Sequence, residues 1–470
     1  MVIKGFWEKL TKPIIGLAPM DGVTDAPFRF MVAKYGKPSL MITEFTSVEG
    51  ICTGATKMLH AFAYDEIERP IVAQIFGSTP SACYKSTFLI CELGFDGVDI
   101  NMGCPAKNVA AKGSGAGLIL TPKLAQEIVF ETKRAAQEWA DGKKIEDVGL
   151  PASIIAYLEE RKRAPHFPKN IARRTLPVSV KTRIGYNEIV IEEWIKNLLE
   201  TEPANISIHG RTLKQMYTGK ADWDAIARAA AIIHQTQTGV LGNGDIQSIA
   251  DARQKITKYG VDGVLIGRST FGYPWLFQGT PSRENIFSKI LQHLHLKKSG
   301  PAPRIGSTTN FIDSMPQNSV AIEQKFAAAI EHSKLYQKYF PYMPFVAMRK
   351  HLAWYCRGFE NAAHLRAHLA HALPVFVVGA RGQRAGDEVA VAVEVLGGRV
   401  HHDVGAERQR LREHRRGHGG VHGQQGTGTV RCRRRIGDVG YGPQRVGRRL
   451  HPHELGAAGP QRCAQGRGVG

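Results

Sequence analysis

The chain has 470 residues and a formal net charge of +20 at pH 7, with 62 Lys plus Arg against 42 Asp plus Glu. That length can bury a sizeable core, as two or three domains or as one large barrel with an appendage. No apolar run approaches the ~20 residues of a membrane span, and residues 1–10 lack the apolar core of a signal peptide. The seven cysteines include no C-x-x-C pair, so we expect no metal site and a reducing, cytoplasmic setting.

Eight short β-rich runs alternate with helix-like stretches over residues 1–278. One helix signal is Ser248, an N-cap residue that opens a stretch ending at Tyr259-Gly260. Eight such units favour an α/β fold closed into a (β/α)8 TIM barrel over the alternative of an open, doubly wound sheet. The predicted strands are residues 14–20, 40–47, 71–78, 97–104, 177–184, 205–211, 240–246 and 263–270.

The fourth predicted strand ends in a Gly-Cys-Pro turn, which places Cys104 at its carboxyl end. Pro105 fixes this turn, and the glycine-rich residues 113–117 would let backbone approach a ligand closely. A single thiol at a strand tip suits acid or nucleophile chemistry. Taken alone, the turn is equally compatible with a buried structural cysteine.

Polar residues also mark the carboxyl ends of the other predicted strands, where the active sites of TIM barrels lie. Burying so many polar groups at one end is hard to explain by packing alone. Glycine-flanked loops after the seventh and eighth strands are typical of a phosphate site, and a lysine on the fifth would stabilise negative charge on a reduced flavin. The polar residues are Glu44, Gln74, Asn101, Lys181, Arg183, His209, Arg211, Asn243, Asp245 and Arg268. Pro19, Met20, Gly244 and Gly267 lie at the same strand ends.

The C-terminal third of the chain differs from the barrel region. Residues 279–375 are predicted to be helical, and Arg349 and Arg357 lie eight positions apart, so they can share a helix face and contact phosphates. A solvated helix face is the plainer alternative. Residues 297–319 are predicted to be a linker rich in Pro, Gly and Ser.

The end of the chain, residues 376–470, is abnormal in composition. Residues 381–470 hold 17 Arg, no Lys, 8 Asp plus Glu and 20 Gly, a net charge of +9 that leaves +11 for the other 380 residues. Such a segment cannot form an ordinary core. We favour a frameshift or misannotated end over a disordered Arg/Gly-rich RNA-binding tail, because GC-rich DNA encodes this composition in a wrong frame. The +11 of the remainder supports a polyanionic partner.

Several motifs at the strand ends, taken together, are similar to those of one enzyme family. They are residues 18–29 (APMDGVTDAPFR), 98–105 (VDINMGCP), 180–185 (VKTRIG), 208–212 (IHGRT), 242–245 (GNGD) and 263–269 (GVLIGRS). The chain resembles the tRNA-dihydrouridine synthase (Dus) family, in its DusB-like bacterial branch, over residues 10–370. The Asn-x-Gly-Cys-Pro element is the most specific of these motifs.

The resemblance implies an FMN enzyme that reduces the C5–C6 double bond of a uridine in the tRNA D-loop, with NADPH or NADH as reductant. It implies that hydride goes from reduced FMN to C6, while Cys104 gives a proton to C5. The implied FMN contacts are Ala18, Pro19, Met20, Gln74, Lys181, His209, Asn243, Gly244, Asp245, Gly267 and Arg268. The implied substrate contacts are Asn101, Arg183, Arg211, Arg349, Lys350 and Arg357.

The resemblance also suggests how the chain is divided. Residues 1–278 would be the FMN-binding barrel, with an insertion at about 141–174, and residues 279–375 a helical tRNA-binding domain. The insertion is rich in Lys and Arg, and is either an extra tRNA contact or a solvated excursion. We expect a monomer.

Two other functions stay open at this point. One is a different FMN barrel acting on a small molecule, such as a dihydroorotate dehydrogenase-like protein or an ene-reductase. The other is a tRNA-binding or chaperone protein with a dead flavin site. The Asn-x-Gly-Cys-Pro turn and the basic helical appendage argue against the first, and the intact Cys104 and Lys181 argue against the second.

Overall fold

The computed structural model describes residues 2–164, 167–168, 170–278, 320–359, 362–363 and 365–366. The predicted linker at 297–319 and the predicted tail at 376–470 lie outside these residues, as does the first part of the predicted helical domain. The chain divides into two compact units, Met1–Asp403 and Val404–Gly470, of which the second also lies outside the described residues. Within the described part, no helix is long and apolar enough to cross a membrane.

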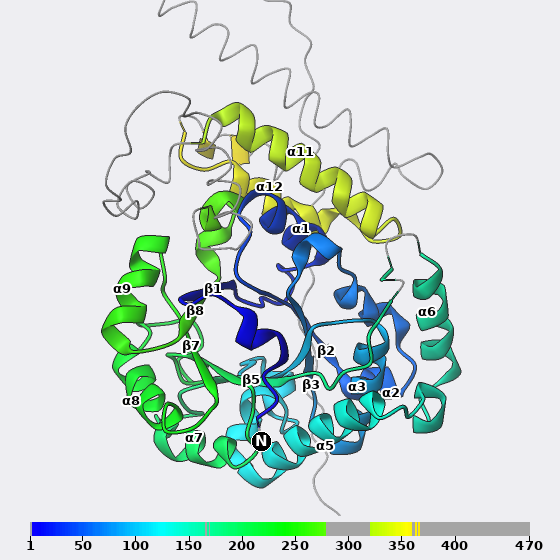
Figure 1. The fold of residues 1–470 in the computed structure, drawn as a ribbon. Coiled ribbons are helices and arrows are strands. Elements are labelled where there is room, and N and C mark those ends of the chain that lie inside the picture. The colour runs from blue at the N-terminus through cyan, green and yellow to red at the C-terminus, as the bar shows by residue number, and fades with distance from the viewer. Residues whose placement is uncertain are drawn as a thin grey trace, which may run out of the picture. The chain divides into compact units, whose positions relative to one another are not determined.

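Eight parallel strands close into a barrel in chain order, so the TIM barrel prediction is confirmed (Figure 1). Each strand pairs with the next, and β8 closes the ring by pairing with β1. The strands are β1 (Ile14–Leu17), β2 (Met41–Ser47), β3 (Ile71–Phe76), β4 (Gly97–Met102), β5 (Val178–Arg183), β6 (Asn205–His209), β7 (Gly239–Asn243) and β8 (Gly263–Ile266).

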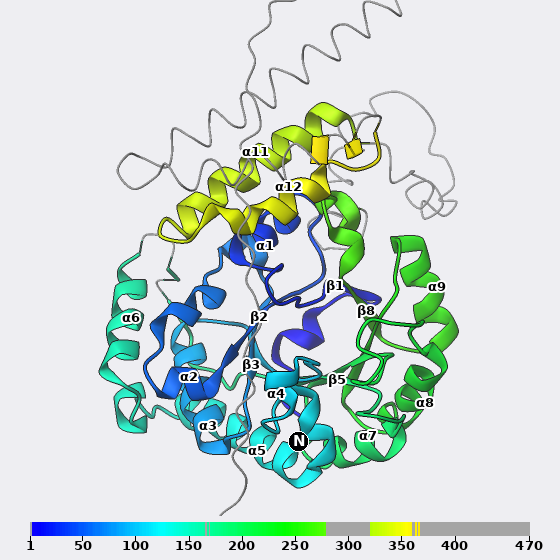
Figure 2. The same cartoon turned by 180° about the vertical axis from the view of Figure 1, so that it is seen from behind.

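Helices surround the barrel, as both views of the ribbon show (Figures 1 and 2). Predicted capping residues are seen in place: the Ser248 side chain accepts from Asp251 at the start of α9, and Gly260 ends that helix with a left-handed φ of 64°. The α-helices of the barrel are α1 (Ala26–Tyr35), α2 (Val48–Cys52), α3 (Pro80–Glu92), α4 (Lys107–Ala110), α5 (Pro122–Ala140), α6 (Ala152–Arg163), α7 (Ile191–Leu199), α8 (Trp223–Ile233) and α9 (Ile249–Tyr259).

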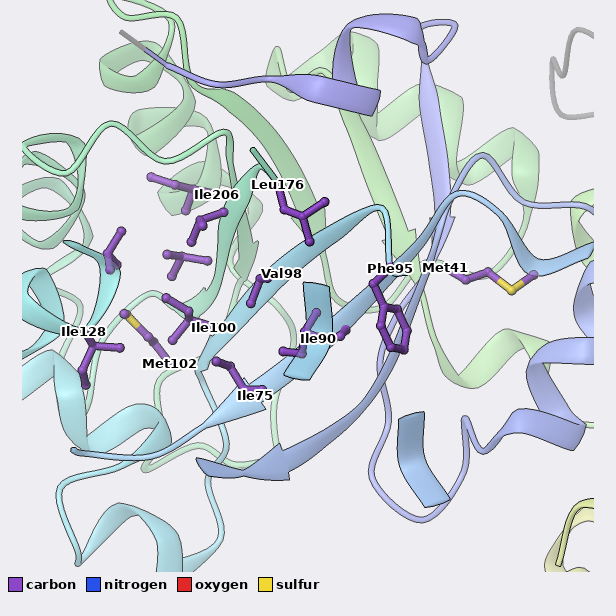
Figure 3. Packing of buried hydrophobic residues seen from close by; sticks show 14 of the residues in the cluster. Met41, Ile75, Ile90, Phe95, Val98, Ile100, Met102, Ile128, Leu176 and Ile206 are labelled. Atoms are coloured by element: carbon purple, nitrogen blue, oxygen red, sulfur yellow. The ribbon is translucent and has the colours of Figure 1, made fainter. Parts of the chain in front are cut away.

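Alternation along the strands separates an apolar outer layer from a polar interior. Val98, Ile100 and Met102 of β4 pack outward among side chains of the neighbouring helices, including Ile90 and Ile128 (Figure 3). Because successive strand residues face opposite sides, Asp99 and Asn101 then face the barrel interior. The same alternation holds in β5 and β6, so the interior is polar toward the carboxyl ends of the strands.

The interior near the amino ends of the strands is apolar. Phe6 from the 3₁₀ turn η1 (Gly5–Lys9) joins Ile14, Leu40 and Val72 in a separate core cluster there. This cluster supplies a floor beneath the polar groups, so the barrel is a packed core with its chemistry confined to one end.

The described part of the helical segment packs on the barrel beside α1 (Figures 1 and 2). It comprises α11 (Ile322–Tyr339), the 3₁₀ turn η8 (Phe345–Met348) and α12 (Arg349–Tyr355). Met31 of α1 shares a buried cluster with Ala328, Leu352 and Tyr355. Glu331 of α11 also accepts from the Tyr35 hydroxyl at 2.7 Å. Barrel and helices thus share one apolar interface in the described residues.

The insertion packs against the barrel through its own helix, α6. Its Tyr157 hydroxyl donates to the Leu59 carbonyl at 3.1 Å, and Ile154 and Leu158 are fully buried. Several of its basic residues pair with barrel acids, and Lys162 lies 2.9 Å from Glu92. Arg173 and Arg174 lie 3.4 Å from Glu92 and Asp96, respectively. These ion pairs attach the insertion to the barrel, and the prediction of an extra tRNA contact there stays a prediction.

Two histidines at the barrel–helix interface are buried without complete hydrogen bonding. His332 and His351 are 0% and 1% exposed, with ring centroids 4.9 Å apart. Both ring nitrogens of His351 and Nε2 of His332 have no hydrogen-bond partner within the described residues. Burial lowers the pKa of His332 to about 3 and that of His351 to about 2, so both are neutral in the folded protein.

This burial predicts acid lability. Below pH 6.5 the histidine is protonated in the unfolded state but stays neutral in the folded state. The free energy of unfolding therefore falls by about 1.4 kcal/mol per pH unit for each such histidine. Because the His351 ring has no hydrogen-bond partner in the described part of the chain, His351→Leu is expected to be near neutral or stabilising at pH 7.5. At pH 5 it should gain about 2 kcal/mol relative to the unaltered chain.

The measurement is urea unfolding of both proteins at pH 7.5 and pH 5. Burial and the charge of Glu44 raise the pKa of Asp25, at the start of α1, to about 7. Protonation of Asp25 therefore stabilises the folded state as the pH falls, opposite to the effect of the histidines, and it does so equally in both proteins. His234→Leu is the matched control, since 45% of that side chain is exposed. Equal losses of stability at pH 5 in the unaltered chain and the His351 variant would contradict the prediction.

Candidate active site

Cys104 lies in the turn after β4, and Asn101 builds that turn. The Asn101 side-chain oxygen accepts from the backbone amides of Gly103 at 3.0 Å and Cys104 at 2.8 Å. Its amide nitrogen donates to Gln74 Oε1 at 2.9 Å. Asn101, predicted as a substrate contact, therefore uses its amide to fix the position of Cys104, and 8% of the residue is exposed.

A buried hydrogen-bonded row supports this turn from below. Gln74 Nε2 donates to Asp99 at 2.7 Å, and the Ser179 hydroxyl donates to the other oxygen of Asp99 at 2.7 Å. Burial raises the pKa of Asp99 to about 6, although the bonds from Gln74 and Ser179 and the charge of Lys181 oppose the shift. Sequence reasoning missed Asp99, whose inward position in the alternation of β4 was the available signal.

The Cys104 thiol is only 7% exposed. Burial raises its pKa above the usual range, and the nearby charge of Asp21 raises it further. The Ala106 backbone amide and the charge of Arg183 act in the opposite direction and support the thiolate. A thiol that is protonated at neutral pH can donate a proton, whereas nucleophilic cysteines need a lowered pKa.

Lys181, His209 and Asn243 lie on adjacent strands beside this turn. The strand register pairs Asn101 with Lys181, and His209 with Asn243. Lys181 Nζ donates to Asn243 Oδ1 at 3.3 Å. Burial and the charge of Arg183 lower the pKa of Lys181 to about 8, against the charge of Asp99.

His209 lies among cations and is neutral. Burial lowers its pKa well below the usual value, and the charges of Lys181, Arg183, Arg211 and Arg268 lower it further. The concentration of positive charge at one end of the barrel makes this region a site for an anion.

At the end of β7 the backbone is closely packed and favours glycine. Gly244 has a φ of 125°, and an added Cβ would lie 2.7 Å from the Ala221 side chain. Asp245 has a left-handed φ of 50° and accepts from Arg211 and Arg268, both at 2.6 Å. Burial alone would raise the pKa of Asp245, but the Ala221 amide and both arginines lower it. The Arg268 side chain is 58% exposed, so it can also face a ligand.

The loop after β1 borders the same region. The Ala18 amide donates to the Ile266 carbonyl at 2.9 Å, which ties the start of this loop to β8. The Met20 sulfur lies 3.0 Å from where a Cβ on Gly267 would be. The loop with Ala18, Pro19 and Met20 thus lies next to Gly267. This proximity is what we expect if all four residues contact one cofactor.

Arg183 and Arg211 are almost fully buried, 3% and 2% exposed, and they organise backbone. Arg183 donates to the carbonyls of Gly103 at 2.7 Å, Thr212 at 3.0 Å and Met216 at 3.1 Å. It therefore ties the Cys104 turn to the loop after β6. Burial lowers the pKa of Arg183 to about 10, against the charges of Tyr217 and Cys104.

The same loop presents an aromatic residue that sequence reasoning missed. Arg211 donates to the carbonyls of Thr218 at 3.1 Å and Gly219 at 2.6 Å, so both arginines hold the loop in place. At its tip Tyr217 is 64% exposed. A fixed, exposed aromatic ring beside a cationic site is a suitable surface for stacking a nucleobase.

The three predicted cations of the helical segment have different surroundings. Lys350 Nζ donates to the Gly22 carbonyl in the loop after β1. The Arg349 Nε atom is buried and has no hydrogen-bond partner within the described residues. Arg357 is exposed, and its backbone carbonyl accepts from Lys325 at 3.2 Å.

The donor set of this region suits a flavin mononucleotide. No group of three or more His, Cys, Asp or Glu side chains in the described part of the chain could hold a metal ion. The region combines the cation Lys181, a neutral His209 and the exposed Arg268. These groups suit an anionic phosphate and a ring that becomes negatively charged on reduction.

Comparison with known proteins gives a consistent result. The family model "Dihydrouridine synthase (Dus)" matches residues 16–140 and 169–375, more than half of the chain, and omits most of the insertion. The chain is 35% identical over 301 residues to the "Probable tRNA-dihydrouridine synthase" of Staphylococcus aureus (strain COL), which covers 63% of this chain and 80% of that protein. It is 34% identical over 298 residues to "Probable tRNA-dihydrouridine synthase 2" of Bacillus subtilis (strain 168), covering 62% and 79%.

A solved structure, dihydroorotate dehydrogenase (DHODH) of Eimeria tenella in complex with ferulenol, aligns with 60% of this chain and 82% of its own. The TM-score is 0.38 and the identity 12%, too low to support any functional conclusion. The extended match to the family model and the curated bacterial relatives decide the assignment instead. The chain belongs to the dihydrouridine synthase family.

Proposed function

We propose that the chain is a tRNA-dihydrouridine synthase, an oxidoreductase that saturates the C5–C6 double bond of a uridine in the tRNA D-loop. The observation that supports this most directly is a buried, protonated Cys104 thiol beside the cations of the barrel end. Family membership and the names of the bacterial relatives supply the reaction.

The chain itself supplies the proton. Cys104 donates its Sγ proton to C5 of the uracil ring, and the thiolate left behind is supported by the Ala106 amide and the charge of Arg183. Solvent then returns a proton to the sulfur. Asn101 and Arg183 hold the turn, so that the thiol has one position when the base arrives.

The cofactor would be held at the ends of β5 to β8 and by the loop after β1. When bound, FMN would supply the hydride for C6, with NADPH or NADH as the source of its electrons. Lys181 and His209 would contact the ring. Asn243 accepts a hydrogen bond from Lys181, and Gln74 accepts one from Asn101, so both amides would hold these side chains in place. Gly244, Asp245, Gly267 and Arg268 would form the phosphate end, and Ala18, Pro19 and Met20 the flank.

The macromolecular partner would be tRNA, bound by a monomer in the cytoplasm. A base inside a folded loop must leave its stack to reach this end of the barrel. Tyr217 is placed to stack on it or on a neighbour, while Arg349 and Arg357 would contact phosphates. Arg183 and Arg211 would act mainly through the loop they hold.

Substrate competition tests the proposal against its alternatives. The purified chain, loaded with FMN, is mixed with NADPH and one of three substrates: unmodified tRNA, orotate or a simple enone. We expect NADPH oxidation in the absence of oxygen to depend on tRNA alone. Oxidation driven by orotate or the enone would favour a small-molecule reductase, and a chain that binds no FMN would favour a tRNA-binding protein with a dead site.

A further inference from the structure

The short helix α12 touches both loops that flank the proposed flavin site. Its Lys350 donates to the Gly22 carbonyl in the loop after β1. Its Trp354 stacks on Phe271 in the loop after β8, with ring centroids 3.9 Å apart and planes 13° from parallel. These are separate contacts from opposite ends of one helix, and each reaches a different loop.

The contact at Gly22 lies in a tight turn centred on Met20. The amides of Val23 and Thr24 both donate to the Met20 carbonyl, at 3.0 and 2.9 Å, and the Thr24 hydroxyl accepts from the Met20 amide at 2.9 Å. Gly22 has a left-handed φ of 68°, which favours glycine at this point. A bond to the Gly22 carbonyl therefore fixes the turn that presents Met20 to Gly267.

Charge strengthens this contact. Lys350 faces the carboxyl groups of Asp21 and Asp25, and the Gly22 amide in turn supports the charged forms of Asp21 and Glu44. Glu44 of β2 and Lys350 of α12 therefore both act on the backbone of Gly22. A charged donor on a carbonyl is stronger than a neutral hydrogen bond.

The contact at the other loop is equally close. A Cβ on Gly272, which has a left-handed φ of 68°, would lie 2.1 Å from the Trp354 carbonyl oxygen. Phe271 and Gly272 follow the 3₁₀ turn η6 (Arg268–Thr270), whose first residue is the predicted phosphate contact. The backbone of α12 and the backbone of the β8 loop therefore meet without an intervening side chain.

We infer that Lys350 is a positioning residue, which acts with Trp354 to make α12 a clamp on the two flavin-binding loops. The inference rests on the proposed function. It gives the helical segment a role inside the flavin site, in addition to any contact with tRNA. It also assigns Lys350 to the Gly22 carbonyl and away from a tRNA phosphate.

The test is the affinity of the full chain for FMN alone, measured by quenching of flavin fluorescence without tRNA. Lys350→Met removes the charged donor and is expected to raise the dissociation constant about tenfold or more. Lys350→Arg keeps a charged donor and should recover most of the affinity. Lys338→Met removes an exposed charge from α11 and should leave FMN binding within twofold.

Affinity for tRNA in the same variants separates the two roles. With FMN saturating, Lys350→Met should weaken tRNA binding no more than Lys338→Met does. Unchanged FMN affinity in Lys350→Met would overturn the inference, and so would a loss confined to tRNA binding with a reduced salt dependence. If the unaltered chain bound no FMN, both the proposed flavin site and this inference would be wrong. If all variants bound FMN as tightly as the unaltered chain, only the inference about α12 would be wrong.

Discussion

Cys104→Ala is expected to lower the rate of dihydrouridine formation by about 10²- to 10⁴-fold, the usual worth of a positioned general acid. In the proposed mechanism, the substitution removes the group that protonates C5. The hydrogen bonds that build the turn use the backbone amide of residue 104, so the turn itself should persist. Binding of FMN and its reduction by NADPH should therefore stay within a few-fold of the unaltered chain.

Two further variants sharpen this prediction. Cys104→Ser keeps the shape of the side chain but replaces the thiol by a much weaker acid, so it should be nearly as slow as alanine. Cys52→Ala is the matched control, since this half-buried cysteine lies in α2, away from the strand ends, and its contact with the Ala82 carbonyl is long, 4.0 Å. A Cys104→Ala protein that retained a third or more of the rate would show that another group, or water, delivers the proton.

Arg29→Met is expected to cost about 3–5 kcal/mol of unfolding free energy, because it leaves one partner of a buried ion pair uncompensated. Arg29 and Glu68 form an ion pair at 2.6 Å with both side chains fully buried. Arg29 also donates to the carbonyls of Thr24, at 2.6 Å, and Ala63. Losing the guanidinium would leave a buried carboxyl group and two carbonyls without these partners.

The measurement is denaturant unfolding, followed by circular dichroism. Arg29→Met/Glu68→Met should be less destabilised than the sum of its single variants, because removing both charges leaves no unpaired ion. Arg228→Met is the control: the Arg228–Glu192 pair is 50% and 42% exposed, so its loss should cost less than about 1 kcal/mol. A cost for Arg29→Met as small as that of the control would contradict the account of this network.

The sequence motif that contains Arg29 shows what sequence analysis can reach. The strand pattern predicts the barrel, because strand alternation and helix capping are local, and all eight strands appear where they were expected. The motifs also indicate which strand ends hold the chemistry. What Arg29 binds could not be read from the motif, since Glu68 and Ala63 approach it only through the tertiary fold.

The same division applies within the site. On β4 to β6, some of the side chains that face the barrel interior were predicted as site residues, among them Asn101 and Lys181. Asp99 and Ser179 face the interior too, by the same strand alternation, but were not predicted. The resemblance implied substrate contacts for Arg183 and Arg211, whereas their guanidinium groups lie against loop carbonyls. Arg183, for example, reaches the carbonyls of Thr212 and Gly103, which come close to it only in the folded chain, so residue type alone could not identify these partners.

The central claim is that this chain makes dihydrouridine in tRNA, and the most direct test is the nucleoside content of the product. Unmodified tRNA is incubated with the purified chain, FMN and NADPH, digested to nucleosides and analysed by mass spectrometry. We predict a nucleoside heavier than uridine by two hydrogen atoms, formed at D-loop positions and nearly absent with Cys104→Ala. A flavin-loaded protein that leaves uridine unchanged in every tRNA offered would contradict the account.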